Sequence, residues 1–230
     1  MNPLAVEQLE ALRRLETPVV ANVIDTLEVR LRNEGFADSS IHCLFPRLAP
    51  MLGYAVTVKI RGSSPPPVGH AYPDRTDWWN HILGLPAPRV VVIQDMDARP
   101  GCGALLGEVH CNILQALGCV GAATNGAVRD LTALESMRFA VFAGSIAVSH
   151  AYAHIVQIGC PVEIGGLHVK PGDLIHGDRH GILSVPGDCA ARIPAAAAIL
   201  LEHERKLIAL CRSPEFTVEK LRAAVKEHHD

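Results

Sequence analysis

The sequence predicts a single α/β domain in which helices flank a parallel-sheet unit at both ends of the chain. Three observations lead to this prediction. Apolar strands and helical segments alternate from about residue 89 to residue 143, which is the order of a right-handed parallel α/β unit. Short strands divided by glycines follow residue 160, and helical patterns occupy both terminal regions.

The composition fits one folded domain and excludes several classes of protein. The chain has 230 residues, 49% of them hydrophobic, with 21 Lys and Arg against 24 Asp and Glu. A chain of this length can bury a sizeable core, and it is too apolar to be disordered. The near-neutral charge and the 4% aromatic content argue against nucleic-acid binding through a basic face or stacking platforms. The apolar excess indicates that partner subunits cover part of the surface.

The cysteines and the N-terminal segment favour a cytoplasmic location. Seven cysteines without a C-x-x-C pair argue against a disulfide framework, so we expect buried free thiols in a reducing compartment. Residues 1–16 carry closely spaced charges and lack the apolar region of a signal peptide. The longest apolar stretch, residues 193–201, is too short for a membrane span, which needs about 20 residues.

The N-terminal region, residues 1–32, predicts two helices. Leucine and valine alternate with charged residues at helical spacing over residues 4–15. Thr17 and Pro18 then supply an N-cap and a first-turn proline for a second helix that runs to about Leu31.

A loop, a strand, a longer loop and a short helix are expected next. Residues 33–50 are loop-like, and β-branched side chains predict a strand over Tyr54–Ile60. Glycine, serines and three consecutive prolines predict a long irregular loop over residues 61–77. A short helix over residues 76–85 would hold both tryptophans, for which we favour packing over a lid or a subunit contact.

The central segment contains the parallel unit. Arg89–Asp95 is a short apolar run of the kind that is buried on both faces of a parallel sheet. Asn125 and Gly126 predict a tight turn. The other expected elements are strands over 119–123 and 140–143 and helices over about 107–117 and 131–137.

The last part of the chain predicts short strands and two helices. Turns are expected at Gly165-Gly166 and at residues 171–173. An alanine-rich helix over about 188–211 precedes a C-terminal helical extension, residues 212–230. No linker or repeat divides the chain, which we interpret as one domain, residues 1–230. The expected strands are 161–164, 167–169, 173–176 and 181–185, and the last helix covers about 217–228.

Two segments combine glycines with charged side chains. Gly101–Glu108 is a glycine-rich loop that opens a helix, so its backbone amides suit a carboxylate or a phosphate. Arg129 and Asp130 follow a strand, at the edge where open α/β sheets bind ligands. Arginine suits a carboxylate, and aspartate suits Mg²⁺ or Mn²⁺. The plainer interpretation is a solvated helix start with Asp130 as its N-cap.

These residues resemble the signature of the RraA-like family: an acidic residue, twenty residues, Arg-Asp, and a second acidic residue a few positions later. The resemblance covers about residues 17–210. The family includes class II 4-hydroxy-4-methyl-2-oxoglutarate and 4-carboxy-4-hydroxy-2-oxoadipate aldolases, and also regulators of ribonuclease E. The matching residues are Glu108, Arg129, Asp130 and Glu135, together with the segments 125–130, 139–144, 161–173 and 176–186.

The resemblance implies an RraA-like α/β sandwich with a swivelling β/β/α core and flanking N- and C-terminal helices. It implies a homotrimer or homohexamer with active sites between subunits, in which Glu202 or Glu204 of a neighbour completes the site. It further implies a metal-dependent lyase that cleaves a small oxo acid, such as 4-hydroxy-4-methyl-2-oxoglutarate, to pyruvate. Oxaloacetate decarboxylation is the implied side activity, because it passes through the same enolate.

The resemblance also implies individual roles. Arg129 binds the keto or enolate oxygen. Asp130 ligates Mg²⁺, Mn²⁺ or another divalent metal, and Glu108 and Glu135 act through metal-bound waters. The substrate carboxylate is held by the backbone amides of Gly107, Glu108, Val109 and His110.

Two positions depart from the family pattern. Asn125 stands where the family usually has aspartate, which keeps the turn chemistry and removes a charge. His110 stands where leucine is usual, so an imidazole is available to contact the substrate. These departures leave the physiological substrate open.

Other functions remain as alternatives. The chain resembles regulators that bind ribonuclease E or another protein without chemistry, although the intact acidic set favours an enzyme. A Schiff-base mechanism needs a desolvated lysine, and only Lys59 lies in an apolar strand. The glycines from Gly101 to Gly107 miss the dinucleotide fingerprint by one residue, which gives no support for nucleotide-dependent methyl transfer.

Two histidine motifs are weaker candidates. His150 and His154 have the i, i+4 spacing of a zinc site on a helix, but no third ligand is evident and a surface or subunit-contact helix start is favoured. His176, Asp178 and His180 cluster at a predicted hairpin, and we interpret them as structural.

Overall fold

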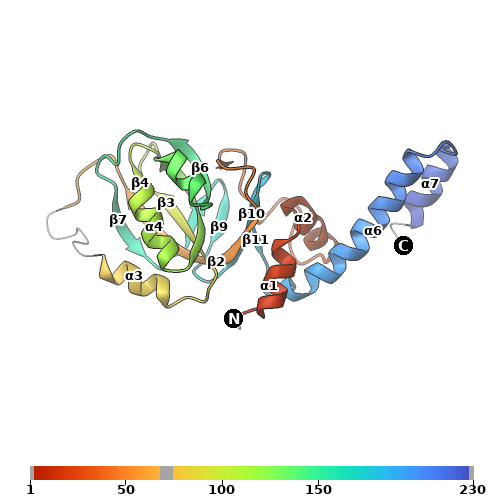
Figure 1. Ribbon diagram of the computed structural model, residues 1–230, viewed down its shortest axis with the longest axis horizontal. Helices are drawn as coiled ribbons and strands as arrows, with labels where there is room; N and C mark the ends of the chain where they lie inside the picture. The colour runs from red at the N-terminus through yellow and green to blue at the C-terminus, as the bar shows by residue number, and fades with distance from the viewer. Residues whose placement is uncertain (1–2, 68–74, 228–230) are drawn as a thin grey trace.

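The computed structural model describes residues 3–67 and 75–227, with a mixed β-sheet at its centre (Figure 1). Four parallel strands form the middle of this sheet, in the order β6-β5-β3-β2. The predicted α/β class with flanking helices is confirmed. The four strands are β2 (Met51–Arg61), β3 (Arg89–Asp95), β5 (Cys119–Val128) and β6 (Ala140–Ile146).

Antiparallel strands extend this parallel unit. β10 (Leu174–Asp178) pairs with the first residues of β2 and with β11 (Gly181–Val185), as a hairpin. A separate hairpin contains β8 (Val162–Ile164) and β9 (Leu167–Val169), joined by the predicted Gly165-Gly166 turn, in which both glycines have positive φ. Three strands were not predicted: β1 (His42–Cys43), which pairs with β6; β4 (Ala104–Leu106), which pairs with β5; and β7 (His154–Ile158), which pairs with the last residues of β2.

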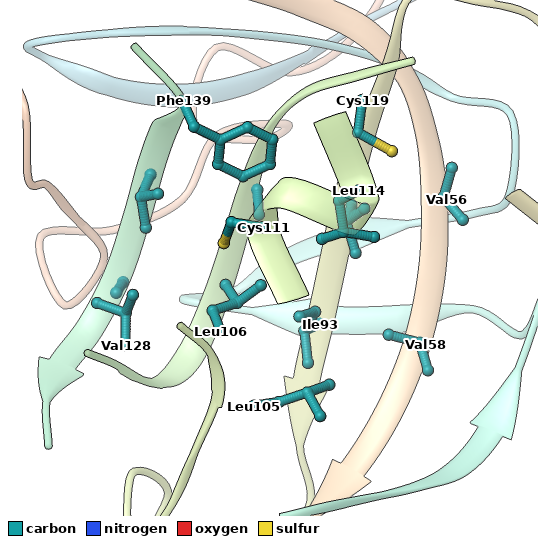
Figure 2. Close-up of a cluster of buried hydrophobic side chains, with 14 of the residues drawn as sticks. Val56, Val58, Ile93, Leu105, Leu106, Cys111, Leu114, Cys119, Val128 and Phe139 are labelled. Atoms are coloured by element: carbon teal, nitrogen blue, oxygen red, sulfur yellow. The ribbon is translucent and has the colours of Figure 1, made fainter. Parts of the chain in front are cut away.

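The apolar run of β3 is buried on both faces, as its continuous hydrophobicity predicts. Val91 and Ile93 face a cluster built with α3 (Thr76–Leu83), α4 (Glu108–Ala116) and α5 (Leu131–Ser136), part of which Figure 2 shows. Val90 and Val92 face a second cluster that includes the β8–β9 hairpin. Because successive side chains of a strand point to opposite faces, one face of β3 packs against helices and the other against strands.

A third hydrophobic cluster joins both ends of the chain. It packs α1 (Val6–Arg13), α2 (Thr17–Thr26) and the start of α6 (Ile193–Cys211) against β10 and β11. α6 buries only Ile193 and Ala197, and its second half projects from the body together with α7 (Val218–Glu227) (Figure 1). In the described part of the chain, no helix is long and apolar enough to cross a membrane.

Several local expectations were wrong. α2 ends at Thr26 rather than near Leu31, because Glu28 takes a left-handed conformation at φ 50°. Thr17 is the first helical residue and Glu16 the N-cap. The amide of Thr17 instead donates to Asp178 Oδ2 at 2.8 Å.

The expected turn at Asn125-Gly126 is also absent, because β5 continues through both residues. A register shift against β6 between Thr124 and Ala127 accommodates them as an irregularity within the strand. The expected helix start at residues 150–154 is a turn that leads into β7, so helical i, i+4 spacing does not apply to its two histidines.

The loop and the cysteines agree with expectation in part. Residues 62–67 have no regular structure, and residues 68–74 of the predicted loop lie outside the described residues. All seven cysteines are free. Burial raises the pKa of Cys111 and Cys119 to about 12, whereas Cys102 and Cys211 are exposed rather than buried.

Candidate functional site

The two charged, glycine-containing segments meet at the ends of two paired strands. β4 runs parallel to β5, with Leu106 opposite Val128, so both strands end at the same edge of the sheet. Arg129 follows β5, and its amide donates to the carbonyl of Leu106 at 3.1 Å. Gly107 follows β4 and is the N-cap of α4. The pairing thus brings together residues about twenty positions apart in the sequence.

Asp130 connects the two segments. Its Oδ2 accepts a hydrogen bond from the Glu108 amide at 2.9 Å and lies 3.5 Å from Arg129 Nε. Asp130 occupies the N-cap position of α5, but its side chain makes no cap bond there and its φ is 59°. The N-cap interpretation is therefore correct for the position of Asp130 in the chain but not for its side chain, which accepts a hydrogen bond from the first residue of α4. A left-handed aspartate costs roughly 1 kcal/mol, which this contact offsets.

Gly107 leaves space for this arrangement. A Cβ on Gly107 would lie 2.7 Å from Asp130 Oδ2 and 3.0 Å from Arg129 Nε. Its φ of −151° is ordinary extended backbone, so glycine is required here by space and not by conformation. The contact between Asp130 and α4 therefore depends on this glycine.

A cavity of about 550 Å³ opens beside this junction. Gly107, Val109, His110 and Arg129, four of the residues expected at the substrate, line it. No Asp or Glu is found in its lining within the described ranges, so its charged and polar wall is suited to an anion. That wall contains Arg75, His110, Arg129, His150, Tyr152 and His154.

His110 presents one ring nitrogen to the backbone and leaves the other unpaired. Its Nδ1 lies 3.1 Å from the carbonyl oxygen of Leu105, whereas Nε2 is buried without a partner among the described residues. Burial, with a smaller contribution from the nearby Arg75, lowers the pKa of His110 to about 4, although the bond to the Leu105 carbonyl acts in the opposite direction. The imidazole is therefore neutral at physiological pH.

The two expected glutamates lie outside the cavity lining. The Glu108 side chain is exposed in the first turn of α4, next to the Asp130 contact made by its own amide. Glu135 is 48% exposed, and its Oε1 lies 3.5 Å from Arg47 on the surface. The structure therefore places Glu108 beside the Arg129–Asp130 pair and Glu135 in a separate ion pair.

The remaining candidates lie elsewhere. Lys59 is within β2, between β3 and β7, and does not line the cavity. Glu202 pairs with Arg205 at 2.8 Å on α6, and neither Glu202 nor Glu204 lines the cavity of its own chain. His176 and Asp178 belong to a buried network with Thr17, as expected for a structural cluster.

Sequence reasoning missed several residues of the cavity wall. Arg75 comes from the segment before α3, and Tyr152 comes from the turn before β7. Trp78 is fully buried, as expected for packing, whereas Trp79 lines the cavity. Only the histidine spacing at residues 150–154 gave a signal for this side of the site.

The donor set suits a hard divalent cation better than zinc. Within residues 3–67 and 75–227, no three His, Cys, Asp or Glu side chains are grouped to hold a metal ion. Asp130 has a second oxygen, Oδ1, which its contacts with Glu108 and Arg129 do not use. Mg²⁺ is commonly held by one or two carboxylates with water and substrate oxygens, so Asp130 fits this mode. A tetrahedral zinc cage is not present in these residues.

Asn125 has a structural role that explains its difference from aspartate. Its Oδ1 accepts from the Asp95 amide at 2.7 Å, and its Nδ2 donates to the Asp95 carbonyl at 3.1 Å. Asp95 is 3% exposed, and its carboxylate accepts bonds from the amides of Asp97 and Gly101. The amide supplies both a donor and an acceptor to this backbone, whereas an aspartate would supply no donor and would add a second negative charge.

Comparison with known proteins gives the same architecture. A 33% identical relative from Halalkalibacterium halodurans is named "Putative 4-hydroxy-4-methyl-2-oxoglutarate aldolase"; the match covers 42% of this chain and 46% of that protein, about half its length. An uncharacterised protein from Pseudomonas syringae pv. tomato str. DC3000 shares the fold with a TM-score of 0.75 at 22% identity, over 96% of this chain and 95% of the other.

A second solved structure is RraAS2 from Streptomyces coelicolor, described as an unusual member of the RNase ES inhibitor RraA protein family. It matches with a TM-score of 0.69 at 19% identity, over 89% of this chain and 97% of the other. The RraA-like family model, described as Aldolase/RraA, matches residues 20–184, which is more than half of the chain. The chain is therefore a member of the RraA-like family.

Proposed function

We propose that this protein is a divalent-metal-dependent aldolase that cleaves a 4-hydroxy-2-oxo acid, such as 4-hydroxy-4-methyl-2-oxoglutarate, to pyruvate. One observation carries the proposal: Arg129 and Asp130 are held against the N-terminus of α4, beside a cavity whose described lining has no carboxylate. The aldolase name of the Halalkalibacterium halodurans relative supports the reaction class.

The substrate's 2-oxo acid end fits the junction of α4 and β5. The first amides of a helix lack intrahelical partners and favour an anion, and at α4 the Glu108 amide is already bonded to Asp130. Val109 and His110 line the cavity, and their amides are therefore assigned to the substrate carboxylate. Arg129, also in the cavity wall, is assigned to the neighbouring keto oxygen.

Cleavage breaks the bond between C3 and C4. The C4 hydroxyl loses its proton and becomes a carbonyl, while the bonding electrons move to C3 and place negative charge on the C2 oxygen. Protonation of the resulting enolate at C3 gives pyruvate, and the methyl-substituted substrate releases a second pyruvate from C4. Arg129 stabilises the charge that develops on the C2 oxygen.

Asp130 is the residue assigned to the metal, with Oδ1 free of its two contacts. A bound Mg²⁺ or Mn²⁺ supplies Lewis-acid stabilisation of the developing charge. Glu108, whose amide is bonded to Asp130, is assigned to a water that accepts the C4 hydroxyl proton. Glu135 is a more distant candidate for this role, because it pairs with Arg47.

We also propose a homotrimer or homohexamer with sites shared between subunits. Few side chains of the projecting α6 and α7 are buried. The exposed apolar residues of these helices and of the segment between them include Ile199, Ile208, Phe216 and Val218. Such a surface is typical of a subunit contact. Glu202 and Glu204 on α6 are then available to complete a neighbour's site.

The test is pyruvate release, followed with a coupled lactate dehydrogenase assay. We expect turnover of 4-hydroxy-4-methyl-2-oxoglutarate with Mg²⁺ or Mn²⁺, its loss in EDTA, and recovery on adding back the cation. Oxaloacetate, which loses CO₂ from C4 to give the same enolate, should be a second substrate. Absence of pyruvate with every divalent metal would contradict the proposal and would favour a non-catalytic regulator that binds ribonuclease E or another protein.

A further inference from the structure

The His110 ring contains an acceptor that the described residues leave unsatisfied. A carbonyl oxygen can only accept, so Nδ1, at 3.1 Å from the Leu105 oxygen, carries the ring proton. Nε2 then presents a lone pair, and it is buried without a hydrogen-bond partner. A buried acceptor without a donor costs free energy, so such groups usually meet a partner in the functional state.

His110 lines a cavity whose other polar side chains are mostly hydrogen-bond donors. His110 is the third residue of α4, and it lines the same cavity as Arg75 and Arg129. His150 and His154 line the cavity too, and the Nδ1 of each lies 2.7 Å from a nearby carbonyl oxygen. Those two bonds are exposed, so water is available to their Nε2 atoms. His110 is distinguished from both by its burial.

The free nitrogen belongs to no cluster of side chains that could hold a metal ion. No group of three His, Cys, Asp or Glu side chains in the described parts of the chain is arranged to hold one. A hydrogen-bond donor on a ligand in the cavity would satisfy this nitrogen. A carboxylate or a keto oxygen is excluded as this partner, because each can only accept.

We infer that His110 is a specificity-determining residue, whose Nε2 accepts a hydrogen bond from the C4 hydroxyl of the bound substrate before that hydroxyl turns its proton to the water held at Glu108. The inference rests on the proposed function and deepens it. At neutral pH a 4-hydroxy-2-oxo acid carries only acceptors apart from this hydroxyl.

The lowered pKa of His110 supports this geometry, because a protonated Nε2 could not accept. The charged and titratable groups that line the same cavity are Arg75, Arg129, His150, Tyr152 and His154. None of them is a carboxylate that would favour a protonated His110.

The experiment compares the wild type with His110→Leu and His110→Gln. Leucine removes the acceptor, whereas glutamine places an amide oxygen near the position of Nε2. Each protein is assayed with 4-hydroxy-2-oxoglutarate, which has the hydroxyl, and with oxaloacetate, which lacks it. 2-Oxoglutarate has the same carbon skeleton as 4-hydroxy-2-oxoglutarate but no hydroxyl group. Its inhibition of the oxaloacetate reaction therefore reports the affinity for a matched ligand without the hydroxyl.

We expect His110→Leu to lower kcat/KM for 4-hydroxy-2-oxoglutarate about 10-fold, the effect of one hydrogen bond. Its kcat/KM for oxaloacetate and its inhibition by 2-oxoglutarate should change less than about 2-fold, and His110→Gln should recover part of the loss. An equal loss on both substrates, or no loss on the hydroxylated one, would overturn the inference and leave the aldolase proposal intact.

A wild type that turns over neither substrate would instead refute the proposed function. Calorimetry then decides the inference separately. Tighter binding of 4-hydroxy-2-oxoglutarate than of 2-oxoglutarate, with the difference abolished in His110→Leu, would sustain it. Equal affinities in the wild type would overturn it.

Discussion

His110 and His176 have the same local chemistry in different surroundings. In each ring Nε2 is buried without a partner among the described residues, and burial lowers the pKa to about 4. Each Nδ1 has a close partner, the Leu105 carbonyl for His110 and Thr17 Oγ1 at 3.0 Å for His176. The residues around each ring differ.

His176 lies in a network that already contains its own carboxylate. Asp178 accepts bonds from the Thr17 amide and from the amide and Nδ1 of His180, which joins α2 to the β10–β11 hairpin. His110 faces a cavity with arginines and no carboxylate in its described lining. The two buried histidines therefore differ in their surroundings: His176 adjoins a hydrogen-bonded network between two elements, whereas His110 adjoins a cavity.

The largest expected effect is the loss of activity when Arg129, in the wall of the cavity next to His110, is replaced. Arg129→Ala should lower kcat/KM for pyruvate release by about 10²–10³-fold, because it removes the charge assigned to the C2 oxygen. The oligomer and the urea unfolding midpoint should stay close to those of the wild type, since the Arg129 side chain is not in the hydrophobic core. Arg47→Ala is the control for removing an exposed arginine, and full activity of Arg129→Ala would rule out this role.

The lowered pKa of His176 should make the free energy of unfolding depend on pH. Below about pH 6.5 the unfolded chain protonates this histidine, whereas the folded chain keeps it neutral down to about pH 4. The unfolded state then binds more protons, so His176 lowers the free energy of unfolding by about 3 kcal/mol from pH 6.5 to pH 4, and His110, whose pKa is lowered to about the same value, adds a comparable fall.

Asp178 adds a second, more acidic phase. Its lowered pKa stabilises the folded state above the ordinary value of 3.8, and this contribution is lost as the pH falls below it. Urea unfolding at a series of pH values measures both phases. In His176→Leu the slope between pH 6.5 and pH 4 should decrease, and an unchanged slope would show that other groups cause it.

A smaller effect is expected beneath the site, at Asn125. Asn125→Asp loses the bond donated to the Asp95 carbonyl and places a second carboxylate beside Asp95, which should cost about 1–2 kcal/mol. Urea unfolding at pH 7 measures the change. Asn112→Asp, on the exposed face of α4, is the matched control. Equal stability of Asn125→Asp and the wild type would show that the amide is not required.

The smallest effect is expected at Glu135. Its exposed pair with Arg47 should contribute less than about 0.5 kcal/mol, so Glu135→Ala should unfold at nearly the wild-type urea concentration. Its activity should fall far less than that of Arg129→Ala. A comparable loss of activity at unchanged stability would place Glu135 in the catalytic set.

The sequence predicted the parallel unit well, because each central strand is a short apolar run and because turns and glycines divide the later hairpins. It failed where tertiary contacts override local preference. Asn125-Gly126 favours a turn, yet hydrogen bonds between Asn125 and Asp95 keep it in β5. The strand β4 is only three residues long and has too short a pattern to recognise.

The same limit applies to the site. The glycine-rich loop before α4, Arg129 and Asp130 were identified as one candidate site from their spacing. The pairing of β4 with β5 brings them together. Arg75 and Tyr152 were not identified, because they reach the cavity from segments that carry no motif. The contact of Asp130 with α4, and not with its own helix, could not be predicted from the sequence, because it depends on how the two helices are placed relative to each other.

That contact has an electrostatic consequence. The end of α4 carries about half a positive charge and Arg129 a full one, but Asp130 cancels most of it before any ligand arrives. A substrate carboxylate and the charge that develops during cleavage therefore arrive at a nearly neutral locus. Electroneutrality then couples substrate to cation: each should raise the affinity for the other by the same factor, as thermodynamic linkage requires.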